Sequence, residues 1–319
     1  MAFDFSQIKS WTIPEGEVQS VSIGGVVVWS ASTLPTDVLA TPTISLDESL
    51  LTMSTTDTRT EEFVVIVKGE EKATVSAIEY TSGMAYKLVE NEDGKMSYTC
   101  VGIGNATDSV IHIPSYTSED EGGDDNIPVT AIGYEAFREA AITGIVIPDT
   151  VTIIDRAAVY NSPTLQKVVV QGIAEIAERV FASNNNLHTV ELNDSIKIIG
   201  SGAFNGCSNL KKITLPNSLT SLAYEVFAGS GLTEIVIPNS VTMIGASAFH
   251  SCKSLESAII GSGVTEIDVA AFYNCTNLKN IAFNGDITQW NAIKINSSLW
   301  HYGVPAKYVQ CVDGNRVAL

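Results

Sequence analysis

Positive charge is scarce in this sequence, where 18 lysine and arginine residues stand against 36 aspartate and glutamate residues in a chain of 319. The formal net charge of −18 argues against binding to nucleic acid or to an anionic membrane, because phosphate groups would be repelled. Long apolar runs are missing as well, and the longest, such as residues 24–29, cannot span a bilayer. We therefore expect neither a nucleic-acid partner nor membrane insertion.

Cysteine is rare, and its five residues are an odd number without the density of a disulfide framework. The N-terminal 21 residues have no basic start followed by an apolar core, so we expect no secretory signal. Together these features favour a chain that is made and folded in a cytoplasm with reduced thiols.

Signatures of enzymes are also missing. The sequence contains no G-x-S-x-G, no H-E-x-x-H and no P-loop, and residues 101–107 carry only half of a dinucleotide-binding fingerprint. The four histidines, at positions 112, 188, 250 and 301, are far apart in the sequence. We therefore expect no enzyme, no catalytic residue and no cofactor.

Two features could suggest a metal site, but both have simpler explanations. Cys207, Cys252 and Cys275 lie one or two repeat units apart, so we expect semi-buried thiols that pack between units. Five acidic residues in 119–125 lack the spaced oxygen ligands and fixed glycine of a calcium loop. We interpret this insertion as a solvated, mobile loop, and calcium binding stays open.

What the sequence does contain is an internal repeat. Residues 231–253 and 254–276 are two copies of one 23-residue unit, and weaker copies extend upstream to residue 109. Two anchor positions recur every 22 or 23 residues, within the range of leucine-rich repeats. The first set of anchors is Phe137, Val159, Phe181, Phe204, Phe227, Phe249 and Phe272, and the second is Ile142, Leu165, Leu187, Leu210, Leu232, Leu255 and Leu278.

Within one unit, the L-x-x-V-x-I-P segment alternates with period two and predicts a strand that ends at the proline. A second short apolar pair follows, and an Ala-Phe pair lies on the return. One coil cannot bury its apolar side alone, so stacked coils share an interior and their strands pair in parallel. The predicted fold class is mainly β, a leucine-rich-repeat solenoid of 22–23-residue coils with N- and C-terminal caps, preceded by small β modules.

The segments outside the repeats predict hairpins and caps. Three hairpins are expected, with their turns at the glycines 24–25, at residues 68–70 and at residues 92–94. The third hairpin is expected to cover the first repeat. Trp290, Trp300 and Tyr302 are expected to cover the last repeat. The predicted parts are an attachment module 1–30, a linker 31–42, a partial fibronectin III or immunoglobulin-like spacer 43–78, a solenoid 79–286 with an N-cap 79–108 and an acidic insertion 115–126, and a C-terminal cap 287–319.

The repeated unit L-x-x-V-x-I-P-x-S-V-T-x-I-G-x-x-A-F-x-x-C resembles the BspA-like, or Treponema-type, leucine-rich repeat family over residues 79–319. Departures are modest: Gln171 and Asn193 replace the strand-ending proline, and Val159 replaces the phenylalanine. The resemblance implies an adhesion protein that binds host matrix or other cells. Members are mostly secreted or on cell surfaces, which conflicts with the missing signal peptide.

The first 30 residues offer a resolution. The segment FDFSQIKSWTIPEGEVQSVSIGGVVVWS is similar to N-terminal segments of phage minor tail and baseplate-associated proteins. This resemblance implies a non-enzymatic virion protein made in the host cytoplasm, whose N-terminus binds other virion proteins and whose solenoid contacts a host cell-surface protein or glycan or a neighbouring subunit. Two alternatives remain, a bacterial cell-surface adhesin and an internal scaffold, and a homo-oligomer is left open.

Candidate contact residues follow from the strand alternation. One outward column is partly apolar, which indicates either a partner-binding face or the ordinary preference of strands for β-branched residues. The candidate partner-binding face comprises Val146, Lys167, Val169, Thr189, Glu191, Lys212, Thr214, Glu234, Val236, Ser257 and Ile259. The candidate attachment residues are Trp11, Val21, Ile23, Val26, Val28 and Trp29.

Overall fold

The computed structural model describes residues 20–23, 26–30, 62–67, 70–76, 81, 83–90, 94–117, 127–172 and 175–319. The chain divides into two compact units, residues 1–80 with 119–123 and residues 81–118 with 124–319. The second unit contains the repeats. Among the described residues, no helix is long and apolar enough to cross a membrane.

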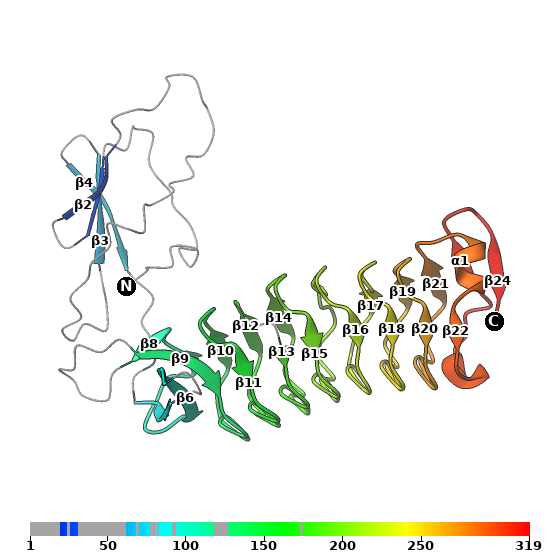
Figure 1. Ribbon diagram of the computed structural model, residues 1–319, viewed down its shortest axis with the longest axis horizontal. Helices are drawn as coiled ribbons and strands as arrows, with labels where there is room; N and C mark the ends of the chain where they lie inside the picture. The colour runs from blue at the N-terminus through cyan, green and yellow to red at the C-terminus, as the bar shows by residue number, and fades with distance from the viewer. Residues whose placement is uncertain are drawn as a thin grey trace. The chain divides into compact units, whose positions relative to one another are not determined.

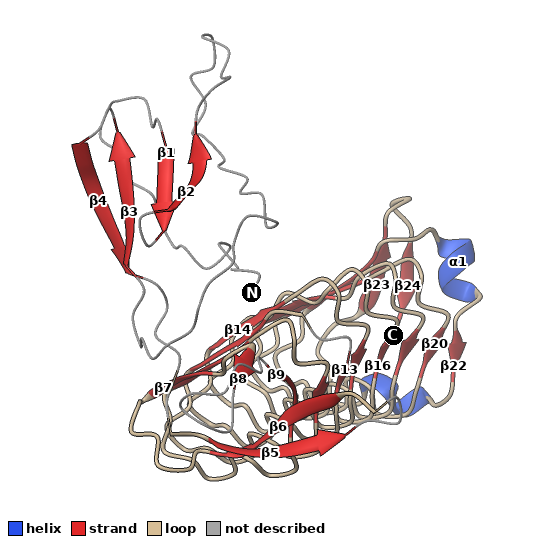
Figure 2. Cartoon of the chain, turned by 60° about the vertical axis from the view of Figure 1, so that its left-hand side comes forward, coloured by secondary structure: helices blue, strands red, loops and turns tan. Residues whose placement is uncertain are grey.

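The first unit contains two antiparallel hairpins that share one sheet, in the order β2-β1-β3-β4 (Figure 2). Its strands are β1 (Ser20–Ile23), β2 (Val26–Ser30), β3 (Glu62–Val67) and β4 (Glu70–Ser76). The hairpins expected at residues 24–25 and 68–70 are thus confirmed. Because β1 also pairs with β3, strands from the predicted attachment module and the predicted spacer belong to the same sheet.

The second unit is a solenoid whose coils follow one another in chain order, as Figure 1 shows from β10 to β22. Most coils contribute one strand to a long-strand ladder, whose strands pair in parallel from β7 to β14 and from β17 to β23. The ladder contains β7 (Val110–His112), β10 (Gly144–Ile147), β12 (Lys167–Val170), β14 (Thr189–Leu192), β17 (Glu234–Val236), β19 (Ser257–Ile260), β21 (Asn280–Phe283), β23 (Tyr308–Cys311) and the antiparallel β24 (Arg316–Ala318).

A second ladder is built from the short apolar pairs of the repeat. It begins with the antiparallel pair of β5 (Ala85–Glu90) and β6 (Met96–Gly102), which confirms the hairpin expected around residues 92–94. The hairpin adds to β9 (Ile127–Ile132), which also pairs with β8 (Tyr116–Thr117). The two-residue strands are β11 (Ile153–Ile154), β13 (Glu175–Ile176), β15 (Ile198–Ile199), β16 (Ser221–Leu222), β18 (Met243–Ile244), β20 (Glu266–Ile267) and β22 (Lys294–Ile295).

One coil departs from the expected pattern. The segment around residues 211–215 has no assigned strand, so the long-strand ladder consists of two sheets, one ending at β14 and the other starting at β17. Its inward side chains Ile213 and Leu215 remain buried, and Lys212 and Thr214 remain exposed. The inside–outside alternation therefore continues although no strand is assigned to this segment.

The anchors fill the interior as the repeat predicts. Every phenylalanine anchor is at most 1% exposed, and the rings from Phe181 to Phe272 stack in successive coils with centroids 4.9–5.6 Å apart. Val159 is also fully buried, in the coil where the phenylalanine is replaced. Because the rings stack in the same way in successive coils, these coils have the same cross-section and equivalent residues lie above one another.

The C-terminal segment continues the coil pattern before ending it. It contains α1 (Ile287–Asn291), closed by a capping box between Asp286 and Gln289, and the 3-10 helix η3 (Ser298–His301). Trp290 and Trp300 are buried, and Trp300 lies edge-on to Phe272 at 6.0 Å. The expectation that Tyr302 covers the end is wrong, because Tyr302 is 59% exposed and stacks on Tyr273 outside the core.

Candidate binding surface

The predicted partner-binding residues lie on the long-strand ladder, and we call the outward side of that ladder the strand face. Strand register aligns Val146 with Val169 and Glu191, and Val236 with Ile259. Among the apolar residues of the strand face named here, Val236 is the most exposed, at 54%. Glu191, Lys212, Thr214 and Glu234 are exposed, whereas Val146, Lys167, Val169, Thr189, Ser257 and Ile259 are half-buried.

Charges on the strand face are paired between neighbouring coils. Lys167 Nζ lies 2.7 Å from Glu191 Oε1, and Lys212 Nζ lies 2.8 Å from Glu234 Oε1. The hydrogen bond to Glu234 and its negative charge raise the pKa of Lys212. Because all four side chains are substantially exposed, these pairs arrange the surface more than they stabilise the fold.

The strand face has a shallow depression at its N-terminal end. Its volume is about 300 Å³, and it is lined by Val110, Gly144, Val146, Lys167 and His188 among others. Gly144 lies between Val110 and Lys167 in strand register, and the Val110 side chain lies beside it, since a Cβ at Gly144 would meet Val110 Cγ1 at 3.2 Å. The strand alternation predicted which residues of these strands face outward, but it did not predict the depression. A depression depends on the volumes of side chains in neighbouring coils.

The turn that carries each anchor repeats an unusual backbone conformation. Residues two before and two after the anchor have positive φ in seven successive coils, from Glu135 and Glu139 around Phe137 to Ala270 and Asn274 around Phe272. Positive φ is strained for residues other than glycine. Eleven non-glycine residues adopt it, and their varied identities explain why the sequence pattern did not reveal this feature.

From Val159 onward, the position three residues after the anchor is a buried serine, asparagine or cysteine that connects neighbouring coils. The Oγ of Ser162 donates to the Phe137 carbonyl at 2.7 Å, and the Sγ of Cys207 donates to the Phe181 carbonyl at 3.1 Å. Cys252 and Cys275 donate in the same way to the carbonyls of Phe227 and Phe249. These cysteines are completely buried rather than semi-buried, because they satisfy carbonyls that no strand pairs with.

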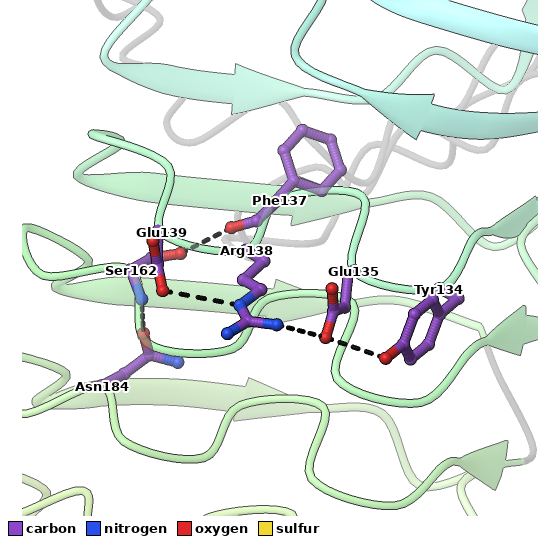
Figure 3. Close-up of polar contacts among 7 residues, drawn as sticks. All are labelled: Tyr134, Glu135, Phe137, Arg138, Glu139, Ser162 and Asn184. Carbon is purple, nitrogen blue, oxygen red and sulfur yellow. Dashed lines mark hydrogen bonds and ion pairs between the residues drawn. The ribbon is translucent and has the colours of Figure 1, made fainter.

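Asn184 is the most connected side chain at this position. It is fully buried, and its Nδ2 donates to the carbonyls of Val159 at 2.7 Å and Phe181 at 2.9 Å. Its Oδ1 accepts from the backbone N–H of Ser162 at 2.7 Å, as Figure 3 shows. One side chain thus links two coils through three backbone groups.

Thiol chemistry and metal binding have little support in the described residues. Burial raises the pKa of the Cys207 thiol to about 12, and that of Cys100 also to about 12, so both favour the neutral form. No group of three or more His, Cys, Asp or Glu side chains in the described ranges is arranged to hold a metal. Residues 118–126, which include the five clustered acids of the insertion, lie outside the described residues.

Half-buried and exposed aromatic side chains lie on the turns that carry the anchors. His250, Tyr273 and Tyr302 stack in successive coils, with ring centroids 5.3 and 5.1 Å apart. At the other end, the Tyr134 hydroxyl donates to Glu135 at 2.9 Å, and Arg138 contacts Glu135 and Glu139 (Figure 3). His188 and His250 therefore lie on different sides of the solenoid.

The candidate attachment residues belong to the first unit. Val21 and Ile23 lie in β1, and Val26, Val28 and Trp29 lie in β2, where Val21 pairs with Trp29 in the backbone register. Trp11 lies outside the described residues.

Comparison with solved structures finds other leucine-rich-repeat proteins. The leucine-rich repeat protein of T. pallidum is 25% identical, over 62% of this chain and 78% of that chain, with a TM-score of 0.43. A leucine-rich cell surface protein of Faecalibacterium prausnitzii is 23% identical, over 69% of this chain and 98% of that one, with a TM-score of 0.30. The pneumococcal vaccine antigen PcpA is 20% identical, over 72% and 69%, with a TM-score of 0.49.

No curated protein sequence matches this chain. The model of the family described as BspA type leucine-rich repeat region (6 copies) matches residues 130–256 and 174–298, which together cover more than half of the chain. These ranges contain the buried anchors and the strands from β10 to β22. The chain therefore belongs to the BspA-type leucine-rich repeat family.

Proposed function

We propose that this chain is a non-enzymatic adhesion protein whose strand face binds a protein partner. The observation that carries the proposal is the strand face itself, a surface formed by successive coils and held by a packed core. Its apolar side chains Val146, Val169, Val236 and Ile259 alternate with the paired charges described above. Repeat proteins use such extended surfaces for protein–protein contact.

Binding suits this surface better than catalysis does. The cysteines are buried, with thiols used as hydrogen-bond donors to carbonyls in the repeats. The strand-face lysines are paired with glutamates of the next coil, Lys167 with Glu191 and Lys212 with Glu234. An apolar row surrounded by paired charges instead resembles the mixed composition of protein interfaces.

The proposed location is a phage tail, at the tip, baseplate or fibre. The N-terminal segment, which is similar to phage minor tail proteins, would dock on the particle through the β1–β2 hairpin. The solenoid would then present its strand face to a host cell-surface protein or a neighbouring subunit. The alternative is a bacterial cell-surface adhesin, which the family membership favours.

A charge placed in the apolar row tests the binding surface. Val236→Lys should abolish binding of the labelled full chain to its target cells, because a lysine there disrupts an apolar contact without disturbing the core. Ile153→Lys is the matched control, since Ile153 is 57% exposed on the short-strand ladder. Equal binding by the Val236 variant and the wild type would contradict the proposed surface.

Imaging decides the location. An antibody raised against the solenoid should label the tails of purified particles and leave intact uninfected bacteria unlabelled. Labelling of bacterial cells, with none on particles, would instead establish the cell-surface adhesin.

A further inference from the structure

The depression at Gly144 interrupts a row of side chains that otherwise covers the strand face. In strand register this row runs Val110, Gly144, Lys167, Thr189 through β7, β10, β12 and β14. Glycine is the member without a side chain, and Val110 beside it is 40% exposed. A volume of about 300 Å³ lies at the small end of ligand pockets, which suits one partner side chain better than a chain segment.

The lining combines an apolar part, which we call the floor, with a polar part, which we call the rim. The floor comprises Val110, Gly144 and Val146, and the rim comprises Gln166, Lys167 and His188. Lys167 is paired with Glu191 at 2.7 Å, so the rim gains little net charge from it. The Nδ1 of His188 is 2.9 Å from the Thr189 hydroxyl, which leaves Nε2 available to an incoming group.

We propose that this depression is an anchor pocket for one tyrosine side chain of a protein partner. The proposal rests on the proposed function of the strand face and assigns its point of specificity. A phenol ring covers the valine floor, and its hydroxyl hydrogen-bonds with the amide of Gln166 or with His188 Nε2. Tyrosine presents a rigid apolar body with one polar tip, which is why it is enriched among interface anchors.

Other occupants fit the lining less well. A sugar ring would stack on an aromatic side chain, and the residues that line the depression include no tyrosine, tryptophan or phenylalanine. A carboxylate would meet a lysine that already holds Glu191. A purely aliphatic side chain would leave the amide and imidazole of the rim without a partner.

The test uses the full chain and para-cresol, which is the tyrosine side chain as a free molecule. Backbone amide NMR signals of Gly144 and Thr189 should shift on titration, with saturation in the millimolar range. Toluene, which lacks the hydroxyl, should bind about threefold to tenfold more weakly, as expected for the loss of one hydrogen bond. Phenylacetate should show no advantage over toluene.

A filled pocket provides the decisive variant. A Cβ at Gly144 would meet Val110 Cγ1 at 3.2 Å and the Lys167 carbonyl at 3.6 Å, so the Val110 side chain must move to admit Gly144→Val, and a thermal melt checks that the variant is folded. This variant should lose the para-cresol shifts and bind target cells at least tenfold more weakly. Ser221→Val places the same side chain on the short-strand ladder, outside the strand face, and should leave both measurements unchanged.

The outcomes separate this proposal from the proposed function. If para-cresol causes no shifts, binds no better than toluene, or binds the Gly144→Val variant as well as the wild type, the tyrosine pocket is refuted. Loss of cell binding by Val236→Lys alone would then still support the strand face. Cell binding that neither Val236→Lys nor Gly144→Val reduces would overturn both proposals.

Discussion

Replacing Asn184 with alanine should destabilise the solenoid more than its single side-chain position suggests. The substitution removes hydrogen bonds to three backbone groups in a region with no access to water. The Phe181 carbonyl keeps a partner, because the Cys207 thiol also donates to it. The Ser162 N–H and the Val159 carbonyl are left as buried groups without their side-chain partner.

The expected magnitude follows from these two groups. A buried donor or acceptor without a partner costs about 1–3 kcal/mol, so Asn184→Ala should lower the free energy of unfolding by about 2–6 kcal/mol. Asn184→Ser should recover part of this loss, because Ser162 shows that a hydroxyl at this position can donate to the carbonyl of the previous anchor. The recovery is incomplete because a serine that donates there would leave the Ser162 N–H without a partner.

Urea denaturation followed by circular dichroism measures this effect. Asn185→Ala is the control, since Asn185 is the exposed neighbour and should change stability by less than about 0.5 kcal/mol. If Asn184→Ala lowers the free energy of unfolding no more than this control does, the hydrogen bonds of Asn184 contribute nothing to stability and the reasoning fails. Serine and alanine variants of equal stability would show that the cost comes from packing alone.

Three further predictions concern the core, the turns and alkaline pH. Phe227→Ala should cost about 3–5 kcal/mol in urea denaturation, because it opens a cavity between rings 5.6 and 5.5 Å away; a cost below 1 kcal/mol would contradict the stacked core. Ala270→Gly should stabilise the fold by about 0.5–1 kcal/mol, because the backbone φ of Ala270 is +57°. Ala136→Gly, at a position without positive φ, should destabilise the fold by a similar amount. If thermal melts show that both variants change stability in the same direction, the turns carry no backbone strain at Ala270. The pKa of the Cys207 thiol is about 12 when folded and near 8.5 when unfolded, so stability should fall as pH rises above about 9, by up to about 1.4 kcal/mol per pH unit from this group. The fall should be shallower in Cys207→Ser, and identical pH profiles would exclude this thiol as a cause.

The repeat made most of the fold predictable from the sequence. Phe and Leu anchors at fixed spacing require a shared interior, and the strand alternation located the outward residues correctly, from Val146 to Ile259. The segment around Lys212 and Thr214 shows the limit of this reasoning. Alternation predicts which side chains face inward, but strand pairing also depends on how closely the neighbouring backbone approaches.

Features that join one coil to the next were the hardest to predict. Ser162, Asn184 and Cys207 occupy equivalent positions with different chemistry, and their shared role is visible only when the carbonyl of the previous coil is known. The depression at Gly144 arises in the same way, from a small residue beside Val110 and Lys167. Tyr302 was expected to cover the end of the solenoid because large aromatics usually do, but Trp290 and Trp300 already fill that position.

The regular inside–outside division of the coils has a consequence for how this surface can change. Inward positions are occupied by the buried anchors, whereas an outward residue such as Val236 is largely exposed to solvent. Successive variants can therefore alter recognition one row at a time while the interior stays the same. The solenoid separates the chemistry that specifies its fold from the chemistry that selects a partner, and a new specificity requires no new fold.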